Sequence, residues 1–216
     1  MPSLEPTPSP VALIGDIVGS RAAADRAGLH ARFQSVIEEV TEAVPALEPP
    51  VITLGDEFQA VYPSLGDALR AAFVVRAGLH PVADVRFGLG RGAVTTLDAE
   101  RGVHDGPAYW AARDAIVLAE ERAGRPQTRT ARTAYLAPDE PAALVTAVQA
   151  SLDCLDFMVG SLSTTSREIL GGLMQGEAQA DVADRLGISA SAVSQRVRRD
   201  GLGVALEALA RLEELP

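Results

Sequence analysis

Two aspartates near the ends of strand-like segments could hold a metal ion. Asp16 lies at the end of the apolar run Val11–Ile17, within GDIVGSR, and Asp56 lies in LGDEFQA, between two short strand-like segments. Hard Mg²⁺ prefers one or two carboxylates together with phosphate oxygens and water. If the first strand and the hairpin are neighbours in a sheet, these carboxylates converge on a divalent cation. The alternative is that Asp16 caps a helix and that Gly55-Asp56 only forms a turn.

The residues after Asp16 could bind a phosphate group. Gly19 and Ser20 lie at the predicted turn from strand to helix. Backbone N–H groups at a helix N-terminus form a ready anion site. Arg21 comes next, and it either faces the phosphate or caps the turn. The sequence thus predicts a nucleotide-binding segment at Gly19, Ser20 and Arg21.

A second kind of chemistry is predicted near the C-terminus, where three short helices follow one another. Ser163 caps a helix that runs through Leu173, and a second helix covers Gln179–Leu186. Gly187 then makes a turn, and a third helix covers Ala190–Arg199. This order is typical of a helix-turn-helix motif.

The third helix carries the side chains that could contact double-stranded DNA. These candidates are Ser189, Ser191, Ser194, Gln195, Arg196, Arg198 and Arg199. Serine, glutamine and arginine hydrogen-bond base edges and phosphates. A single motif with few phosphate contacts binds weakly, so a homodimer that reads two half-sites is expected. The alternative is a small helical module for oligomerisation or protein docking.

The elements that position these residues alternate between strand and helix. The order β-α-β-β-α-β predicts an α+β fold, a ferredoxin-like sheet with helices on one face. The predicted elements are a strand over Val11–Ile17, a helix over 24–44, a hairpin of Val51–Leu54 and Phe58–Tyr62, a helix over Leu65–Leu79, a strand over Val85–Val94 and a helix over Pro107–Arg122. A linking helix over 138–160 then leads to the all-α segment 161–216, which ends in a helix over Val204–Leu215. Residues 1–10 are expected to be a flexible leader, and residues 11–137 the α+β domain.

Composition limits the classes of protein that fit. The chain has 216 residues, 47% of them hydrophobic, and a net charge of −10. This apolar share supports a sizeable core and excludes wholesale disorder. The N-terminus lacks the features of a secretory signal, and no apolar run approaches the ~20 residues of a membrane span, so a cytoplasmic protein without membrane contact is expected. The single cysteine, Cys154, excludes an internal disulfide.

The charges are divided unevenly along the chain. Residues 1–160 contain 13 arginines and 21 acids, a net of −8, and residues 161–216 contain 6 arginines and 8 acids, a net of −2. Within the second part, Ser189–Arg199 contains three arginines and no acid. The overall acidity argues against non-specific binding of nucleic acid by the whole surface, but it leaves this local basic segment. The chain contains neither lysine nor asparagine, which excludes mechanisms that need them.

Four segments of the first half resemble the SatD protein family: GDIVGSR (15–21), LGDEFQAVY (54–62), VRFGLGRGAV (85–94) and DGPAYWAARDA (105–115). More distantly, they resemble the catalytic domain of class III adenylate and guanylate cyclases, which has a palm-type sheet. The resemblance implies that Asp16 and Asp56 bind metal, with the carbonyl of Ile17 as a further ligand. It also implies that Arg113 contacts phosphate and, if the protein is an enzyme, takes part in catalysis.

Two positions depart from the cyclase pattern. Tyr109 stands where the cyclases have a phosphate-binding asparagine, and about Thr53 stands where they have an adenine-reading lysine. Loss of one such donor costs on the order of 10²–10³ in rate, by analogy with an oxyanion hole. Nucleotide and metal binding could therefore persist without cyclisation. The segment 162–200 in turn resembles sigma region-four and LuxR-type DNA-binding domains.

These observations predict a DNA-binding transcriptional regulator of the SatD type, whose cyclase-like domain senses a purine nucleotide with Mg²⁺. The alternative is a nucleotidyl cyclase or related phosphotransferase with an accessory helix-turn-helix. A third possibility is that the cyclase-like domain is a scaffold without a ligand.

Overall fold

Strands and helices alternate through the first 136 residues, as the hydrophobic pattern predicts. The computed structural model describes residues 9–98 and 103–216, so most of the predicted leader lies outside the described residues. The elements of this part are β1 (Val11–Ile17), the short 3-10 helix η1 (Ser20–Ala22), α1 (Arg26–Ala43), β2 (Glu48–Leu54), β3 (Glu57–Tyr62), α2 (Leu65–Leu79), β4 (Val85–Arg91), β5 (Thr95–Asp98), β6 (Val103–Asp105), α3 (Pro107–Ala123), η2 (Pro126–Thr128) and β7 (Thr133–Leu136).

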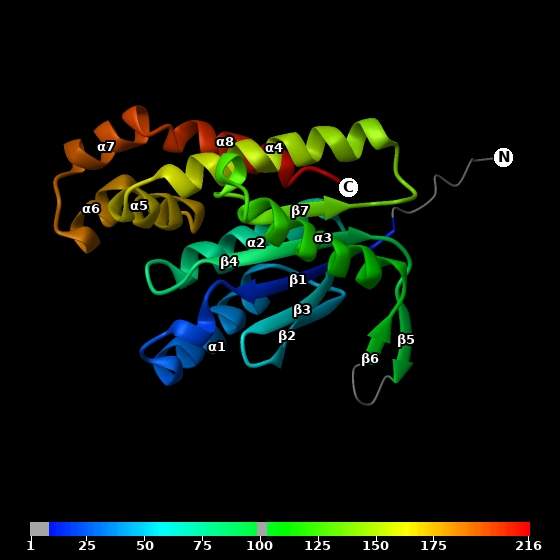
Figure 1. Cartoon of the computed structure of the whole chain (residues 1–216). Coiled ribbons are helices and arrows are strands. Elements are labelled where there is room, and N and C mark those ends of the chain that lie inside the picture. Colours follow the sequence, from blue (N-terminus) through cyan, green and yellow to red (C-terminus); the bar gives the residue numbers. More distant parts are fainter. Residues whose placement is uncertain (1–8, 99–102) are drawn as a thin grey trace.

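Five of these strands form the central sheet, in the order β2-β3-β1-β4-β7 (Figure 1). β1 lies between β3 and β4 and is antiparallel to both. β7 extends the sheet by pairing parallel to β4. The first four strands have the predicted ferredoxin-like arrangement. The edge strand β7 and the separate β5-β6 hairpin are additions that the sequence did not predict.

The face of the sheet that α1 and α2 cover carries the main hydrophobic core. Side chains alternate along β1, so Val11 and Leu13 join this core while Ala12 and Ile14 point to the other face. Phe33 of α1 meets Phe58 of β3 edge to face, with ring centroids 6.0 Å apart. These contacts bury one stripe of each helix against the strands.

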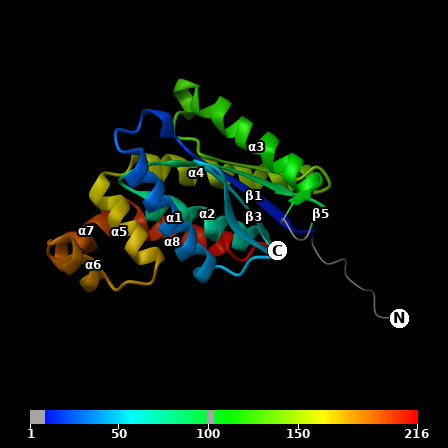
Figure 2. The ribbon, with the colours of Figure 1, turned by 90° about the horizontal axis from the view of Figure 1, so that it is seen from below.

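The opposite face is covered by α3, so the prediction of helices on one face only was wrong (Figure 2). The reason lies in the glycines of β4. A Cβ at Gly88 would lie 2.2 Å from the carbonyl oxygen of Ala112, and one at Gly90 would lie 2.2 Å from that of Ala108. Glycine at these positions therefore lets the backbone of α3 approach β4 directly.

The remaining chain forms five helices above the sheet, as Figure 1 shows. They are α4 (Ala142–Ser161), α5 (Thr164–Met174), α6 (Gln179–Leu186), α7 (Ala190–Arg199) and α8 (Leu202–Leu212). Their buried side chains belong to the same hydrophobic cluster as those of α1 and α2, and α5 and α8 both pack on α2. The C-terminal helices and the sheet thus share one continuous core.

By length and composition alone, α4 is apolar enough to cross a membrane, and it is the one such helix among the described residues. Its residues Val148, Leu152, Leu155 and Val159 are buried in the shared core. It also carries Asp153 and Asp156, which form ion pairs with arginines of the α3–β7 region and of α2. Packing accounts for only part of its apolar character, since 28% of its most apolar window is buried, so the expectation that no segment approaches a membrane span in length and apolar composition was wrong. Location in the cytoplasm stays a prediction.

Candidate functional site

Asp16 and Asp56 lie at the same end of the sheet, because the end of β1 is adjacent to the turn between β2 and β3. The backbone N–H of Ile17 donates a 3.0 Å hydrogen bond to the carbonyl oxygen of Asp56. Asp16 is a strand residue that faces Glu57 in the register of β1 and β3, and it caps no helix. The Ser20 hydroxyl, from η1, donates to Oδ2 of Asp56. The turn at Gly55-Asp56 therefore also binds the end of β1 and η1, through the hydrogen bonds of Asp56 to Ile17 and Ser20.

The Asp16 carboxylate is half-buried among other charged groups. Its Oδ2 accepts a 2.9 Å hydrogen bond from Arg86 Nη1, which also lies 3.4 Å from Glu120. Its Oδ1 is buried and has no hydrogen-bond partner within the described part of the chain. Burial raises the pKa of Asp16 and Arg86 opposes this, while Glu120, Asp56 and Glu57 raise it further. An excess of carboxylates over cations favours a bound cation here.

A cleft of about 340 Å³ opens beside Asp56 on the α1 side of the sheet, whereas the Asp16 side chain lies toward α3 and is not part of its lining. It is lined by Ile17, Ser20, Arg26, Ala27, Leu29, His30, Gly55 and Asp56. Nδ1 of His30 lies 3.2 Å from the carbonyl oxygen of Gly55, which ties α1 to the hairpin turn. The volume falls within the range of about 300–1,000 Å³ that is usual for small-molecule sites.

Arg113 projects from α3 toward the same end of the sheet and is bound by Glu57. Its Nη1 and Nη2 donate to the two carboxylate oxygens of Glu57 over 2.6 and 2.9 Å. This bidentate pairing lowers the pKa of Glu57 and raises that of Arg113. A phosphate could recruit Arg113 only in competition with this carboxylate.

Gly19, Ser20 and Arg21 are placed differently from the predicted strand-to-helix turn. Ser20 begins the three-residue η1, while α1 begins only at Arg26, with Asp25 as its N-cap. Gly19 and Ser20 therefore do not lie at the N-terminus of α1, and the positive end of its helix dipole is not available to a phosphate bound there. Ser20 lines the cleft, and Arg21 is exposed.

Tyr109 is half-buried on α3. Burial, and then the charge of Glu48, raises the pKa of its phenol to about 12.

The donor atoms fit a hard divalent cation in part. Asp16 and Asp56 supply carboxylate oxygens, and the Asp16 Oδ1 atom has no other partner among the described residues. Across residues 9–98 and 103–216, no group of three or more Asp, Glu, His or Cys side chains could hold a metal ion unaided. Mg²⁺ bound here would thus depend on water or phosphate oxygens for its remaining ligands, as is common for this ion.

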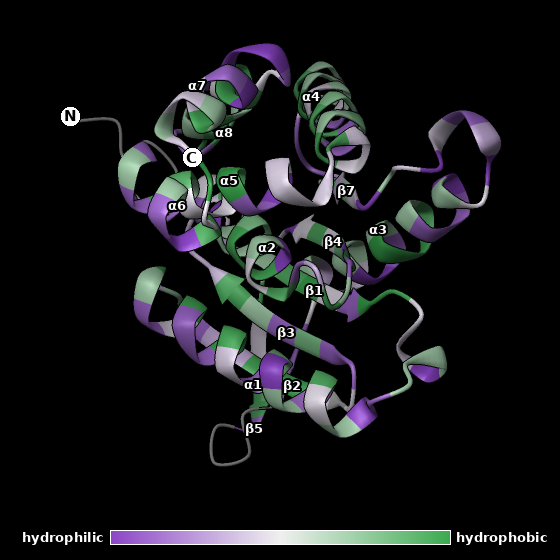
Figure 3. Cartoon of the chain, turned by 90° about the vertical axis from the view of Figure 1, so that its left-hand side faces the viewer, coloured by the Kyte–Doolittle hydropathy of each residue, from purple (hydrophilic) through white to green (hydrophobic). Residues whose placement is uncertain are grey.

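The predicted DNA-contacting residues lie on α7, at the outer end of the molecule (Figure 3). Ser191, Gln195 and Arg198 are exposed, and the described part of the chain gives Arg198 no ion pair. Gly187 has φ of +64° and turns the chain between α6 and α7. Val193 is fully buried against the other helices. Because Val193 packs inward, the polar side chains on the opposite face of α7 point to solvent.

Three other residues of the predicted set have structural partners. Ser189 caps α7 by accepting a 3.2 Å hydrogen bond from the backbone N–H of Ala192. Arg196 donates to the Ser166 hydroxyl over 3.2 Å, which links α7 to α5. Arg199 is exposed but pairs with Asp200 at 2.8 Å. Ser194 is half-buried. The exposed stripe is therefore narrower than the sequence predicted.

Comparison with known proteins assigns the family. The sequence model of the SatD family matches residues 10–215, nearly the whole chain. The chain belongs to the SatD family. No curated protein matches its sequence.

Two solved structures of bacterial light-regulated adenylyl cyclases are similar to part of this SatD-family chain. One is 18% identical with a TM-score of 0.42, over 53% of this chain and 71% of the cyclase chain. The other is 16% identical with a TM-score of 0.43, over 52% of this chain and 40% of the cyclase chain.

Several residues around the candidate site were not predicted as a group. Glu57, Arg86, Glu120 and His30 surround Asp16 and Asp56 in the structure. Glu57 directly follows Asp56, and Arg86 faces Asp16 across β1 and β4. That pairing is set by the strand register, in which Gly88 lies opposite Ile14 and Gly90 opposite Ala12.

Proposed function

We propose that this SatD-family protein is a DNA-binding regulator that binds a purine nucleotide in the cleft beside Asp56, with Mg²⁺ held at Asp16 and Asp56. The observation that carries the DNA-binding part is the exposed polar stripe of α7, formed by Ser191, Gln195 and Arg198. Buried Val193 fixes the orientation of this helix, and the turn at Gly187 sets it against α6. This arrangement supports a helix-turn-helix in which α7 enters the major groove.

The nucleotide part rests on the carboxylates and the adjoining cleft. Asp16, Asp56 and the Ile17 carbonyl would hold the Mg²⁺, which supplies positive charge to neutralise phosphate oxygens. The Ser20 hydroxyl already lies against Asp56 and would face the same ligand. Arg21 is exposed near the cleft and could contact a phosphate. These residues bind and orient the ligand, and no chemical step is required of them.

The geometry favours binding over catalysis. Glu57 holds Arg113 in a bidentate ion pair, and Arg86 occupies one oxygen of Asp16. Tyr109, with a phenol that stays protonated at neutral pH, replaces an amide donor. Release of Arg113 would break two charge-assisted hydrogen bonds, which solvent screening at this half-exposed arginine limits to about 1 kcal/mol in total. A phosphate-stabilising arginine is therefore not preorganised in this state.

DNA binding is tested by fluorescence anisotropy with fragments of the source genome at low salt. Arg198→Gln should weaken binding several-fold and reduce its salt dependence, because one phosphate or base contact is lost. Arg211→Gln is the matched control, since Arg211 is an equally exposed arginine on the neighbouring α8. Titration with and without ATP or GTP and Mg²⁺ tests the regulatory part. Absence of any DNA binding at low salt would overturn the proposal.

The competing function is a nucleotidyl cyclase or related phosphotransferase, which the two carboxylates at one end of the sheet and the cleft beside Asp56 favour. Product analysis with each nucleoside triphosphate and Mg²⁺ or Mn²⁺ distinguishes it from a sensor. Turnover that is lost in Asp56→Ala would establish the enzyme. Saturable nucleotide binding without product, also lost in Asp56→Ala, would support the sensor.

A further inference from the structure

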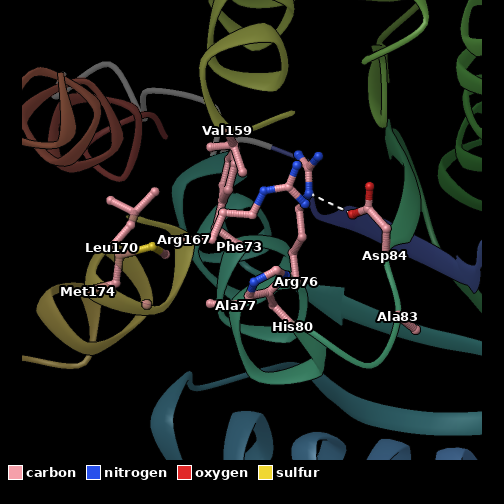
Figure 4. Close-up of a pocket in the computed structure, with 11 residues that line it drawn as sticks. Phe73, Arg76, Ala77, His80, Ala83, Asp84, Val159, Arg167, Leu170 and Met174 are labelled. Carbon is pink, nitrogen blue, oxygen red and sulfur yellow. Dashed lines mark hydrogen bonds and ion pairs between the residues drawn. The ribbon is translucent and has the colours of Figure 1, made fainter. Parts of the chain in front are cut away.

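A second small cavity, which shares no lining residue with the cleft beside Asp56, lies where α4 and α5 meet the end of α2 (Figure 4). Its volume is about 30 Å³, which is room for two or three water-sized atoms when about 10–15 Å³ holds one water. Most of the lining is apolar. It consists of Phe73, Ala77, Ala83, Val159, Leu170, Gly171 and Met174, together with Arg76, His80, Asp84 and Arg167.

Three nitrogen atoms of this lining are buried without a hydrogen-bond partner in the described structure. They are Nη2 of Arg76, Nε2 of His80 and Nε of Arg167. Arg76 is 5% exposed, and Figure 4 shows its guanidinium group close to that of Arg167. Leaving one buried donor unsatisfied costs about 1–3 kcal/mol, and more for a charged group. Arg76 Nη2 and Arg167 Nε are donors, so these two atoms beside one cavity indicate a missing acceptor.

The charge balance of the lining points to an anion. Two guanidinium groups face one carboxylate, that of Asp84, whose oxygens are already engaged by Arg76 at 2.9 Å and by Arg132 at 2.7 Å. The other partner of Arg76 is Asp156, which lies behind it on α4. Arg167 donates through Nη2 to the carbonyl oxygen of Gly160, a neutral partner. Arg76 thus has two carboxylate partners, whereas Arg167 forms no ion pair among the described residues, and water would satisfy its hydrogen bonds without supplying an opposite charge.

His80 adds a switchable donor to the cavity. Its ring is hydrogen-bonded to the backbone of Thr164, and since Nε2 has no partner among the described residues, that bond uses Nδ1. Burial, and then the charge of Arg167, lowers the pKa of His80. Glu168 on α5 and Asp84 act in the opposite direction. An anion in the cavity would favour protonation, and Nε2–H would then become a third donor.

We propose that this cavity, which is partly open to solvent, binds the carboxylate group of a small acid between Arg76 and Arg167, while the short apolar part of the acid lies at the open side, against the partly buried Met174. The apolar lining favours a carboxylate over phosphate, which has no apolar part to bury. The site is assembled from α2, α4, α5 and the segment before β4. Its ligand would therefore stabilise the contact between the sheet and the C-terminal helices.

The test uses the full chain and two readouts. Thermal unfolding is followed in acetate, propionate, phosphate and chloride, at an ionic strength held constant with a bulky sulfonate salt. A site-specific carboxylate should raise Tm saturably, by roughly 5–10 °C at one hundred times its Kd. Arg167→Gln should weaken this effect at least tenfold. Arg70→Gln, at an exposed arginine of the same α2, is the matched control and should leave it unchanged.

The second readout needs no variant. In the wild-type protein, the NMR signals of the His80 ring should shift with propionate and show a raised pKa, while those of His30 and His104 should stay in place. Equal Tm values in all four anions, with unmoved His80 signals, would overturn the proposal. Phosphate that shifts His80 while both carboxylates do not would overturn the assignment of ligand class.

Discussion

Replacing Asp156 by alanine should strongly destabilise the protein, because this buried carboxylate joins three elements. Its side chain is 1% exposed and accepts hydrogen bonds of 2.7 Å from Arg76 Nη1 and from the backbone N–H groups of Arg132 and Thr133. Asp156→Ala leaves the Arg76 charge buried and two backbone donors unsatisfied. Removing one partner of a buried ion pair typically costs about 3–5 kcal/mol.

That loss is a large fraction of the roughly 5–15 kcal/mol by which a domain is stable. For a chain of this size, about 2–4 °C of Tm corresponds to each kcal/mol, so Tm should fall by about 6–20 °C. Urea unfolding followed by circular dichroism gives the free energy of unfolding directly. Trp110 fluorescence reports on α3 separately, and the two transitions should coincide because α3 packs directly on β1 and β4 of the same sheet.

The matched control is Asp153→Ala, one turn earlier on α4. Asp153 is 36% exposed and pairs with Arg122 at the surface, an interaction worth up to about 1 kcal/mol. If Asp156→Ala cost no more than this control, the buried network would not be what holds α4 to the sheet. Two separate unfolding transitions would show that the sheet and the C-terminal helices fold independently.

Three further changes test the packing, the charges and the turn. Gly90→Ala should lower the free energy of unfolding by about 1–3 kcal/mol in urea titrations, since its Cβ would overlap the Ala108 carbonyl oxygen. Burial opposes ionisation of Asp84, but Arg76 and a second guanidinium outweigh it and lower its pKa. Its stabilisation is thus present above roughly pH 4 and lost as pH falls through the lower folded-state value, so the Tm gap between wild type and Asp84→Asn should close in acid. Gly187→Ala should cost about 1–2 kcal/mol, read from thermal melts, because φ there is +64°.

Local signals in the sequence were enough to predict most elements. The bounds of α2, α6 and α7 were predicted as the structure has them, because caps and turn residues mark their ends. Ser64 and Ser189 accept hydrogen bonds from the third residue beyond them, as N-caps do. The hairpin turn at Gly55-Asp56 was also predicted. Each of these features depends on neighbours close in sequence.

Features that depend on contacts between distant segments were not predicted. The glycines of β4 indicated a strand, but only the packed structure shows that they admit α3 to the second face of the sheet. β7 is four residues long and pairs parallel to β4, so no hairpin signal marks it. Arg113 was expected to contact a phosphate, but in the structure it forms an ion pair with Glu57, which lies 56 residues earlier in the chain. The pairing of Arg113 with Glu57 depends on where α3 packs on the sheet, and the separation of the two residues in the sequence does not predict it.

The two candidate sites are linked through Asp84, so their ligands should affect each other's binding. The backbone carbonyl of Asp84 accepts a 2.9 Å hydrogen bond from Val18, in the segment that leads from Asp16 into the cleft. Its side chain binds Arg76, which lines the carboxylate cavity. If binding at either end moves this segment, propionate and Mg²⁺-nucleotide must change each other's affinity by the same factor, since linkage is reciprocal. Calorimetric titration of each ligand with and without the other measures both factors. A factor of one in both directions would mean that Asp84 joins the sites in space without transmitting any free energy between them.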